Sequence, residues 1–311
     1  MKIGSLFTGI GGLELGVCDT VTSIAPYGND IEWIAETDGN ALKILEHSTM
    51  FHGVPNLGDV TKIDWTTVPD VDCITGETPC QDFSHLGTRK GLEGEKSSLL
   101  LTFIEAVKAK KPDYVLWENV TGALTKGAYD VLLDALNEAD YSTSSVILPA
   151  SSLGMPHKRA RIFVFAERTE EWVTPFNDQL VKVRHDTRLR CLPTPNRSRM
   201  DGRKSPGYSK RPSFYDLKQW SEDEVRASYG AAIERWERTL GRGAPPLAKP
   251  KGTINVEFIE WMMGFPKGWV TDAGDVSRTA KLAALGNACT PQQASEAFYY
   301  GLLQLTRERT N

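Results

Sequence analysis

The tripeptide Pro79-Cys80-Gln81 closely follows a short apolar stretch, Asp72–Thr75. Proline fixes φ immediately before the cysteine, so a thiol at the carboxyl end of a strand would project from a rigid backbone into a ligand crevice. That placement suits a nucleophile, although a lone cysteine is more often a small core residue. The other cysteines form no C-x-x-C pair, which disfavours a disulfide framework or a zinc ribbon, and we expect no metal. They are Cys18, Cys73, Cys191 and Cys289.

Two further groups of polar residues follow apolar stretches. Tyr114–Trp117 leads into Glu118-Asn119-Val120, and a carboxylate placed behind an apolar strand can have a raised pKa and act as an acid. The same pattern also fits a carboxylate that caps a turn. Arg159 and Arg161 are spaced by two, so they share one face of an extended segment and suit an oxyanion or carbonyl clamp. Their alternative role is ordinary surface charge.

A glycine-rich turn, Phe7–Gly12, follows the first apolar stretch. Glycines there let the backbone approach a ligand near the positive end of a helix. The dinucleotide pattern G-x-G-x-x-G would need glycine at position 14, where Glu14 stands, so the turn disfavours a pyrophosphate. It favours a nucleoside with a cationic tail, as in S-adenosylmethionine, although a plain tight turn is the alternative. Glu36 then predicts hydrogen bonds to both ribose hydroxyls, and Asp59 a contact with the adenine amino group.

The elements that must position these residues alternate between strand and helix patterns. Such alternation predicts an α/β fold with a doubly wound, mostly parallel sheet whose ligands bind at the carboxyl ends of the strands. The predicted strands are Lys2–Phe7, Glu32–Glu36, Asp72–Thr75, Tyr114–Trp117, Ser144–Leu148 and Arg161–Phe165. The predicted helices in this part are Leu13–Val17, Gly39–His47, Ser97–Ala109 and Ala128–Ala139.

After about Arg168 the sequence becomes rich in proline, which interrupts periodic elements. Helical patterns return at Ser221–Leu240, at Glu257–Met263 and at Pro291–Leu305, where the last could pack back on the first part of the chain. The chain of 311 residues is long enough for two domains. We therefore predict a catalytic and cofactor-binding domain over residues 1–168, completed by residues 274–311, and a smaller irregular domain over residues 169–273.

The charge distribution is uneven. The formal net charge is −4, yet the segment Lys182–Arg211 holds ten basic residues and two acidic ones. This basic segment predicts contact with phosphates, because neutralised phosphates release counterions, whereas a solvated surface loop is the alternative. No apolar run is long enough for a membrane span and no export leader is evident, so we expect an intracellular, cytoplasmic protein without a membrane partner.

Taken in chain order, these residues resemble the DNA (cytosine-5)-methyltransferases of phage and bacterial type. Seven motifs carry the resemblance. They are F-x-G-x-G at Phe7–Gly11, the acidic Glu36, P-C-Q at Pro79–Gln81, E-N-V at Glu118–Val120, R-x-R at Arg159–Arg161, G-F-P at Gly264–Pro266 and the last motif at Gly286–Ala288. Two positions depart from the family pattern. His157 stands where glutamine is usual, which affects the support of the arginines, and Thr78 stands where a hydrophobic residue is common.

The resemblance implies the S-adenosylmethionine-dependent methyltransferase fold with a target-recognition domain, here the second domain. It implies methylation of C5 of a flipped-out cytosine in double-stranded DNA by a monomer, with S-adenosylhomocysteine as product. The catalytic residues would be Cys80, which adds to C6, Glu118, which protonates N3, Arg161, which donates a hydrogen bond to O2, and Arg159. The cofactor-binding residues would be Phe7, Gly9, Gly11, Gly12, Glu36, Asp59, Pro79, Asn287 and Ala288. The DNA-binding residues would be Gln81, Ser84, Arg89, Arg197, Arg199 and Arg203, with residues 84–96 as a lid.

Three other functions remain open at this point. An RNA methyltransferase of the same fold would characteristically carry a C-F-T tripeptide in its recognition region, and this sequence has none. A catalytically silent DNA-binding protein is disfavoured by the intact Cys80 and Glu118. A nicotinamide-dependent oxidoreductase is disfavoured by Glu14. The sequence does not indicate the DNA recognition sequence or a cognate nuclease, because base readout depends on loop conformation and water.

Overall fold

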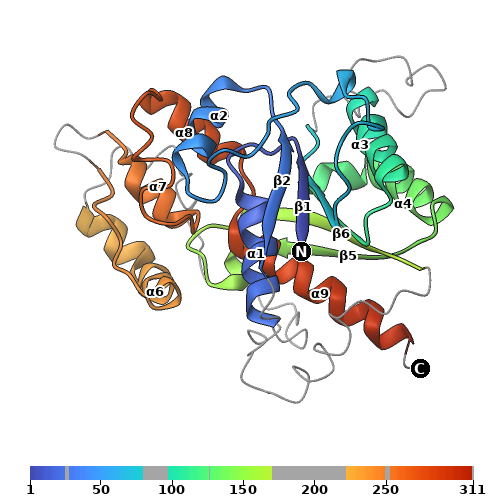
Figure 1. Cartoon of the computed structure of the whole chain (residues 1–311). Helices are drawn as coiled ribbons and strands as arrows, with labels where there is room; N and C mark the ends of the chain where they lie inside the picture. The colour runs from blue at the N-terminus through green and yellow to red at the C-terminus, as the bar shows by residue number, and fades with distance from the viewer. Residues whose placement is uncertain (25–27, 80–96, 126, 170–221, 249–252, 310–311) are drawn as a thin grey trace.

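The centre of the molecule is a six-stranded sheet (Figure 1). The computed structural model describes residues 1–24, 28–79, 97–125, 127–169, 222–248 and 253–309. The strands are β1 (Lys2–Leu6), β2 (Asp30–Ala35), β3 (Cys73–Gly76), β4 (Tyr114–Val120), β5 (Tyr141–Pro149) and β6 (Ala160–Arg168). All six lie where the apolar stretches predict strands, with ends that differ by a few residues.

The strands are ordered β2-β1-β3-β4-β6-β5. The four strands from β2 to β4 are parallel, whereas β6 is antiparallel to both of its neighbours. Residues 150–159 connect β5 to β6 and include the 3-10 helix η5 (Ala150–Leu153); this connection is shorter than the dozen or more residues that parallel neighbours need, so the two strands are antiparallel. The prediction of a doubly wound, mostly parallel sheet is confirmed.

The helices are α1 (Gly12–Ile24), α2 (Gly39–His47), α3 (Ser97–Lys110), α4 (Ala128–Glu138), α6 (Glu222–Leu240), α7 (Val256–Met262), α8 (Arg278–Asn287) and α9 (Pro291–Arg309). Helix α2 has the predicted bounds because Asp38 caps it: the carboxylate accepts hydrogen bonds from the backbone N–H groups of Asn40 and Ala41. Helix α8 was not predicted. It is capped by Ser277, whose hydroxyl accepts from the backbone N–H of Ala280.

Helices cover both faces of the sheet, which makes a three-layer arrangement (Figure 1). Helices α3 and α4 pack on one face, against side chains such as Val115 and Trp117 of β4. Helices α1 and α9 pack against each other and on the opposite face, where Leu116 of the same strand points. Because successive strand residues point to opposite faces, β4 is buried from both sides and reads as a continuous apolar run.

The described parts of residues 222–273 share a core with the first part of the chain. Trp236 of α6 and Trp261 of α7 lie in the same cluster of buried residues as Ile44 of α2 and Ile10 of the glycine turn. The indole of Trp269 donates to the carbonyl oxygen of Ile10 at 2.8 Å. This hydrogen bond fixes the glycine turn at Ile10. The predicted division into two domains, at residues 168 and 273, stays a prediction.

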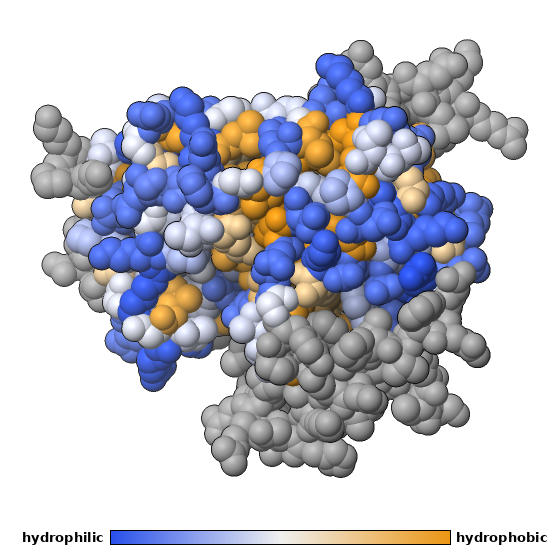
Figure 2. Space-filling model, viewed as in Figure 1, coloured by the Kyte–Doolittle hydropathy of each residue, from blue (hydrophilic) through white to orange (hydrophobic). Residues whose placement is uncertain are grey.

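Hydrophilic residues cover most of the described surface in Figure 2, and hydrophobic residues gather near the centre of the view, where the sheet lies in Figure 1. Among the described residues, Ile147 is the one large hydrophobic side chain that is strongly exposed. No helix in this part of the chain is long and apolar enough to span a membrane.

The chain leaves β1 toward β2 on one side and returns to β3 on the other. In an open α/β sheet such a reversal creates a crevice at the carboxyl ends of the strands, where ligands bind. The residues that follow β1, β2, β3 and β4 therefore meet at one place.

Candidate active site

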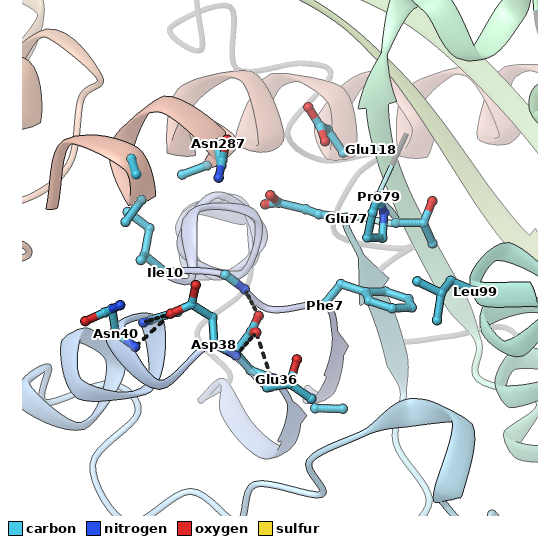
Figure 3. Close-up of a pocket in the computed structure, with 18 of the residues that line it drawn as sticks. Phe7, Ile10, Glu36, Asp38, Asn40, Glu77, Pro79, Leu99, Glu118 and Asn287 are labelled. Carbon is cyan, nitrogen blue, oxygen red and sulfur yellow. Dashed lines mark hydrogen bonds between the residues drawn. The ribbon is translucent and has the colours of Figure 1, made fainter. Parts of the chain in front are cut away.

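A pocket of about 890 Å³ lies at the carboxyl ends of β1 to β4 and is closed on the other side by α8 (Figure 3). Its volume is within the usual range for small-molecule sites. The predicted site residues that line it are Phe7, Gly9, Glu36, Asp59, Pro79, Glu118, Arg161, Asn287 and Ala288. Residues from both ends of the chain therefore meet in one pocket, as the motifs require.

The glycine turn forms the floor of the pocket. Gly9 and Gly11 have positive φ angles of 55° and 80°, which glycine adopts readily. Gly12 begins α1 in close contact with the segment between α8 and α9. A Cβ atom at position 12 would lie 2.1 Å from the carbonyl oxygen of Cys289. Gly11 and Gly12 lie behind the lining and shape the turn, whereas Gly9 faces the pocket.

Glu36 follows β2, and its carboxylate organises the adjacent backbone (Figure 3). One oxygen accepts from the N–H of Gly9 and the other from the N–H groups of Thr37 and Asp38, each at 2.7 Å. These bonds fix the carboxylate at the pocket wall. A carboxylate has about four acceptor positions, so at least one remains for a ligand hydroxyl.

Asp59 lies at the pocket wall near Glu36 in the lining. Its Oδ1 atom caps η1 (Val60–Lys62) by accepting from the N–H and hydroxyl of Thr61, and its other oxygen pairs with Lys62 at 3.1 Å. These hydrogen bonds to Thr61 are the main cause that lowers the pKa of Asp59, so the residue presents a charged acceptor to the pocket.

Glu118 and Arg161 face each other from the neighbouring strands β4 and β6. Arg161 Nε lies 2.9 Å from Glu118 Oε1, and both side chains are largely buried. Burial raises the pKa of Glu118 to about 7, although the positive charges of Arg161 and Arg159 lower it. The carboxyl can therefore hold or release a proton near neutral pH, as its position behind an apolar strand predicts.

Arg159 has partners different from those expected for a clamp on a substrate. Its guanidinium donates to the carbonyl oxygens of Gly286, Asn287 and Ala288, at 2.8, 3.0 and 2.5 Å. It does not line the pocket, although its charge still acts on Glu118. Arg159 thus joins the R-x-R segment to the end of α8 and holds that wall in place.

The backbone that leads into Cys80 is anchored by Thr78. The indole of Trp117 donates to the Thr78 hydroxyl at 2.8 Å, and the side-chain amide of Asn119 donates to both the hydroxyl and the carbonyl oxygen of Thr78. Thr78 and Asn119 are buried. A hydrophobic residue at position 78 would leave the Trp117 N–H without this acceptor, so the departure at Thr78 has a clear polar role.

His157, the other departure from the family pattern, lies beside Arg159. Burial is the main cause that lowers the pKa of His157 to about 4, and the charge of Arg159 lowers it further, whereas a hydrogen bond with the backbone of Met262 raises it. The ring is therefore neutral at neutral pH. It links the segment before β6 to the end of α7 and adds no charge near the arginines.

The interpretation of Glu14 as an acidic group facing the ligand was wrong. Glu14 is 1% exposed and lies beneath the glycine turn, where its carboxyl accepts from the hydroxyls of Ser5 and Thr75 at 2.8 and 2.6 Å. Burial raises its pKa. The acidic character of the pocket comes from other residues, namely Glu36, Asp38, Asp59, Glu77 and Glu118.

Several lining residues were missed in the sequence analysis. Asp38 and Asn40 line the pocket because α2 begins directly after β2, and Leu99 lies there at the start of α3. Ala280, Ala283 and Ala284 belong to the unpredicted α8. Glu77 follows β3 directly and also lines the pocket. Its position between a predicted strand and Pro79 was the sequence signal that could have identified it.

Other predicted site residues lie outside the described part of the chain. These are Cys80, Gln81, Ser84, Arg89, Arg197, Arg199 and Arg203. Their roles remain predictions.

Comparisons with known proteins agree with these motifs. The family model described as C-5 cytosine-specific DNA methylase matches residues 1–239. The orphan methyltransferase M.SPRI of Bacillus phage SPR is 30% identical over 200 residues, which cover 61% of this chain and 44% of that protein. The type II methyltransferase M2.BsuMI of Bacillus subtilis is 29% identical over 314 residues, covering 93% and 72%. The chain thus matches less than half of the phage enzyme.

Solved structures share the fold at low sequence identity. The Dnmt2 methyltransferase of S. pombe has a TM-score of 0.62 at 17% identity, with 100% of this chain and 99% of that chain covered. A putative DNA modification methyltransferase encoded within an E. coli prophage has a TM-score of 0.58 at 18% identity, with 99% of each chain covered. These likenesses support the fold.

Proposed function

The chain belongs to the C-5 cytosine-specific DNA methylase family, and from that premise we propose that it transfers a methyl group from S-adenosylmethionine to C5 of a cytosine in double-stranded DNA. The observation that carries this proposal is the buried pair of Glu118 and Arg161, which lies beside the anchored backbone leading into Cys80. An acid and a cation at one pocket wall, together with a thiol that directly follows Pro79 in the sequence, are the groups that addition to a cytosine ring requires.

The pocket fits S-adenosylmethionine. Glu36, fixed by three backbone N–H groups, suits ribose hydroxyls, and Asp59 suits the adenine amino group. Five carboxyl groups and one arginine line the pocket, which favours a ligand whose tail carries positive charge. The cofactor when bound supplies the electrophilic methyl group that C5 of the cytosine accepts.

Cytosine C5 is not nucleophilic enough to react unaided, so the thiolate of Cys80 first adds to C6. Electron density then moves toward N3 and O2. Glu118 donates its proton to N3, and Arg161 donates a hydrogen bond to O2, which stabilises the developing charge. After methylation, a water molecule accepts the C5 proton, the C5–H electron pair re-forms the C5–C6 double bond, and Cys80 leaves as the thiolate. Glu118 takes back the N3 proton. In this scheme Arg159 is a positioning residue, because its donors bind the end of α8.

The target base must leave the duplex, because C6 and N3 are not accessible inside a stacked helix. Gln81, Ser84 and Arg89 would contact the DNA around the flipped base. The second domain would then bind phosphates through arginines of the basic segment and read bases in the major groove.

Bisulfite sequencing of plasmid recovered from cells that express the chain tests this function. Cytosines in one recurrent sequence context should be protected in cells with the wild-type chain and converted in cells with Glu118→Gln. Bisulfite sequencing of total RNA from the same cells serves as the second readout. Protection in RNA alone would replace DNA by RNA as substrate, and protection in neither would contradict the proposed activity.

A further inference from the structure

Glu77 has an unusual position for a carboxyl group that the catalytic scheme does not use. It directly follows β3 and lines the pocket, and in Figure 3 its side chain extends toward Asn287 on the same side as Glu118. Its Oε2 atom accepts from the backbone N–H of Cys289 at 3.3 Å. Its Oε1 atom is shielded from solvent and has no hydrogen-bond partner among the described residues.

Three charged side chains and one backbone N–H group act on the Glu77 carboxyl. Burial raises the pKa of Glu77 most strongly, and the carboxyls of Glu118 and Glu14 raise it further, while Arg159 and the Cys289 N–H lower it. Within the described ranges no lysine or arginine forms an ion pair with Glu77. Glu77 is partly buried, and a carboxyl whose Oε1 atom is shielded from solvent and has no ion-pair partner is unfavourable when ionised, so this side chain suits a cation that arrives with a ligand.

The positions of the lining residues in the pocket indicate which part of a ligand reaches Glu77 (Figure 3). Glu36 and Glu118 lie on opposite sides of the pocket in Figure 3, and the proposed function assigns the nucleoside to the side of Glu36 and the target base to the side of Glu118. The donor atom of the methyl group has to lie next to the base and carries the amino-acid part, so we place that part along the wall that Glu77 and Asn287 form on the Glu118 side of the pocket. That part carries an ammonium and a carboxylate group.

We propose that Glu77 binds the α-ammonium group of the S-adenosylmethionine tail through its unpartnered Oε1 atom, an inference that rests on the proposed function. The Cys289 N–H holds the other oxygen, so the carboxylate is already oriented before the ligand arrives. Pairing with the ammonium makes the ionised form of Glu77 favourable. A neutral Glu77 carboxyl therefore gives its proton to the solvent when the ammonium binds, and a carboxylate–ammonium pair forms.

Calorimetry with two commercial ligands separates this role from a structural one. S-adenosylhomocysteine carries the ammonium, whereas 5′-methylthioadenosine has the same nucleoside and a thioether without the amino-acid part. Glu77→Gln keeps the side-chain shape and an acceptor for the Cys289 N–H. We expect it to weaken S-adenosylhomocysteine binding about tenfold or more, as for a lost hydrogen bond to a charged group, and to leave 5′-methylthioadenosine binding unchanged.

Proton release provides a readout that needs no variant. At pH 6.5 a free α-ammonium group is mostly charged, so titrations in buffers of different ionisation enthalpy report the protein proton. Wild-type protein should release up to about one proton more with S-adenosylhomocysteine than with 5′-methylthioadenosine, and Glu77→Gln should lose this difference. Glu105→Gln, an exposed change on α3, is the matched control and should behave as the wild type.

Three outcomes decide the proposal. Selective loss of S-adenosylhomocysteine affinity and of its extra proton in Glu77→Gln would support it. Unchanged S-adenosylhomocysteine affinity in Glu77→Gln would overturn it while the proposed function stands. Failure of the wild type to bind S-adenosylhomocysteine or S-adenosylmethionine at all would overturn both, so the two failures are distinguishable.

Discussion

The titration of Glu118 should control the rate of methylation. Glu118→Gln keeps the size of the side chain and one acceptor oxygen but removes the proton that N3 receives. General acid catalysis typically contributes 10²–10⁴-fold, so we expect the single-turnover rate to fall by about two orders of magnitude or more. Binding of S-adenosylmethionine should be retained, because Glu118 lies on the opposite side of the pocket from Glu36 (Figure 3).

The pH dependence follows from the burial of Glu118. Its pKa is raised to about 7, and the form that donates is the protonated carboxyl. The contribution of the Glu118 acid to the rate should therefore be complete below pH 7 and decline as pH rises through 7, in addition to the change in the Cys80 thiolate fraction, which the wild type and Glu118→Gln share. At pH 8 only about one tenth of such a carboxyl remains protonated, which predicts a decline of about tenfold per pH unit. This declining limb should disappear in Glu118→Gln.

Rapid-quench transfer of a labelled methyl group to a duplex that contains the target sequence measures these rates from pH 5.5 to 9. Glu105→Gln makes the same chemical change on an exposed face of α3 and should keep both the wild-type rate and its declining limb. A wild-type rate in Glu118→Gln, or an unchanged decline above pH 7 in that variant, would refute the acid role.

Three other variants test the cofactor end, the anchored backbone and the basic segment. Glu36→Gln should weaken S-adenosylmethionine binding by about 1–3 kcal/mol, the usual size for a lost charged hydrogen bond; equal affinity by calorimetry would remove Glu36 from the site. Thr78→Val should lower the free energy of unfolding by about 1–3 kcal/mol, because the buried Trp117 N–H loses its acceptor; denaturant titration measures this, and Thr78→Ser should recover most of the loss. The third variant replaces Arg197, Arg199 and Arg203 with Ala. If these arginines bind phosphates, the slope of log K against log salt for duplex DNA should become shallower by about 0.9 for each phosphate that is no longer neutralised, and an unchanged slope would exclude them from the interface.

The sequence was sufficient for the order of the elements because each buried strand is a short apolar run beside an amphipathic helix. It was not sufficient for the direction of β6, because the alternation of residues in a strand is the same in parallel and antiparallel pairs. The short connection between β5 and β6 determines that direction. Helix α8 was missed because its apolar residues are mostly alanines that give a weak pattern, even though Ser277 is a good N-cap.

The pairing of Glu118 and Arg161 at the pocket was predictable because each residue lies at a recognisable strand position. Sequence reasoning failed where orientation mattered. Glu14 follows the glycine turn, yet the first turn of α1 directs its side chain beneath the sheet end toward Ser5 and Thr75. Arg159 shares the spacing of Arg161, but the carbonyl groups at the end of α8 take its donors, and no local pattern shows that long-range interaction.

Covalent catalysis by Cys80 is tested most directly with a duplex that carries 5-fluorocytosine at the target. Fluorine cannot leave as a cation, so the methylated adduct with Cys80 cannot break down and should survive denaturing electrophoresis. We expect a trapped complex that requires S-adenosylmethionine, is retained in the control Cys18→Ser and is absent in Cys80→Ser, because a hydroxyl is a far weaker nucleophile than a thiolate. An adduct of the same yield in Cys80→Ser would contradict covalent catalysis by Cys80.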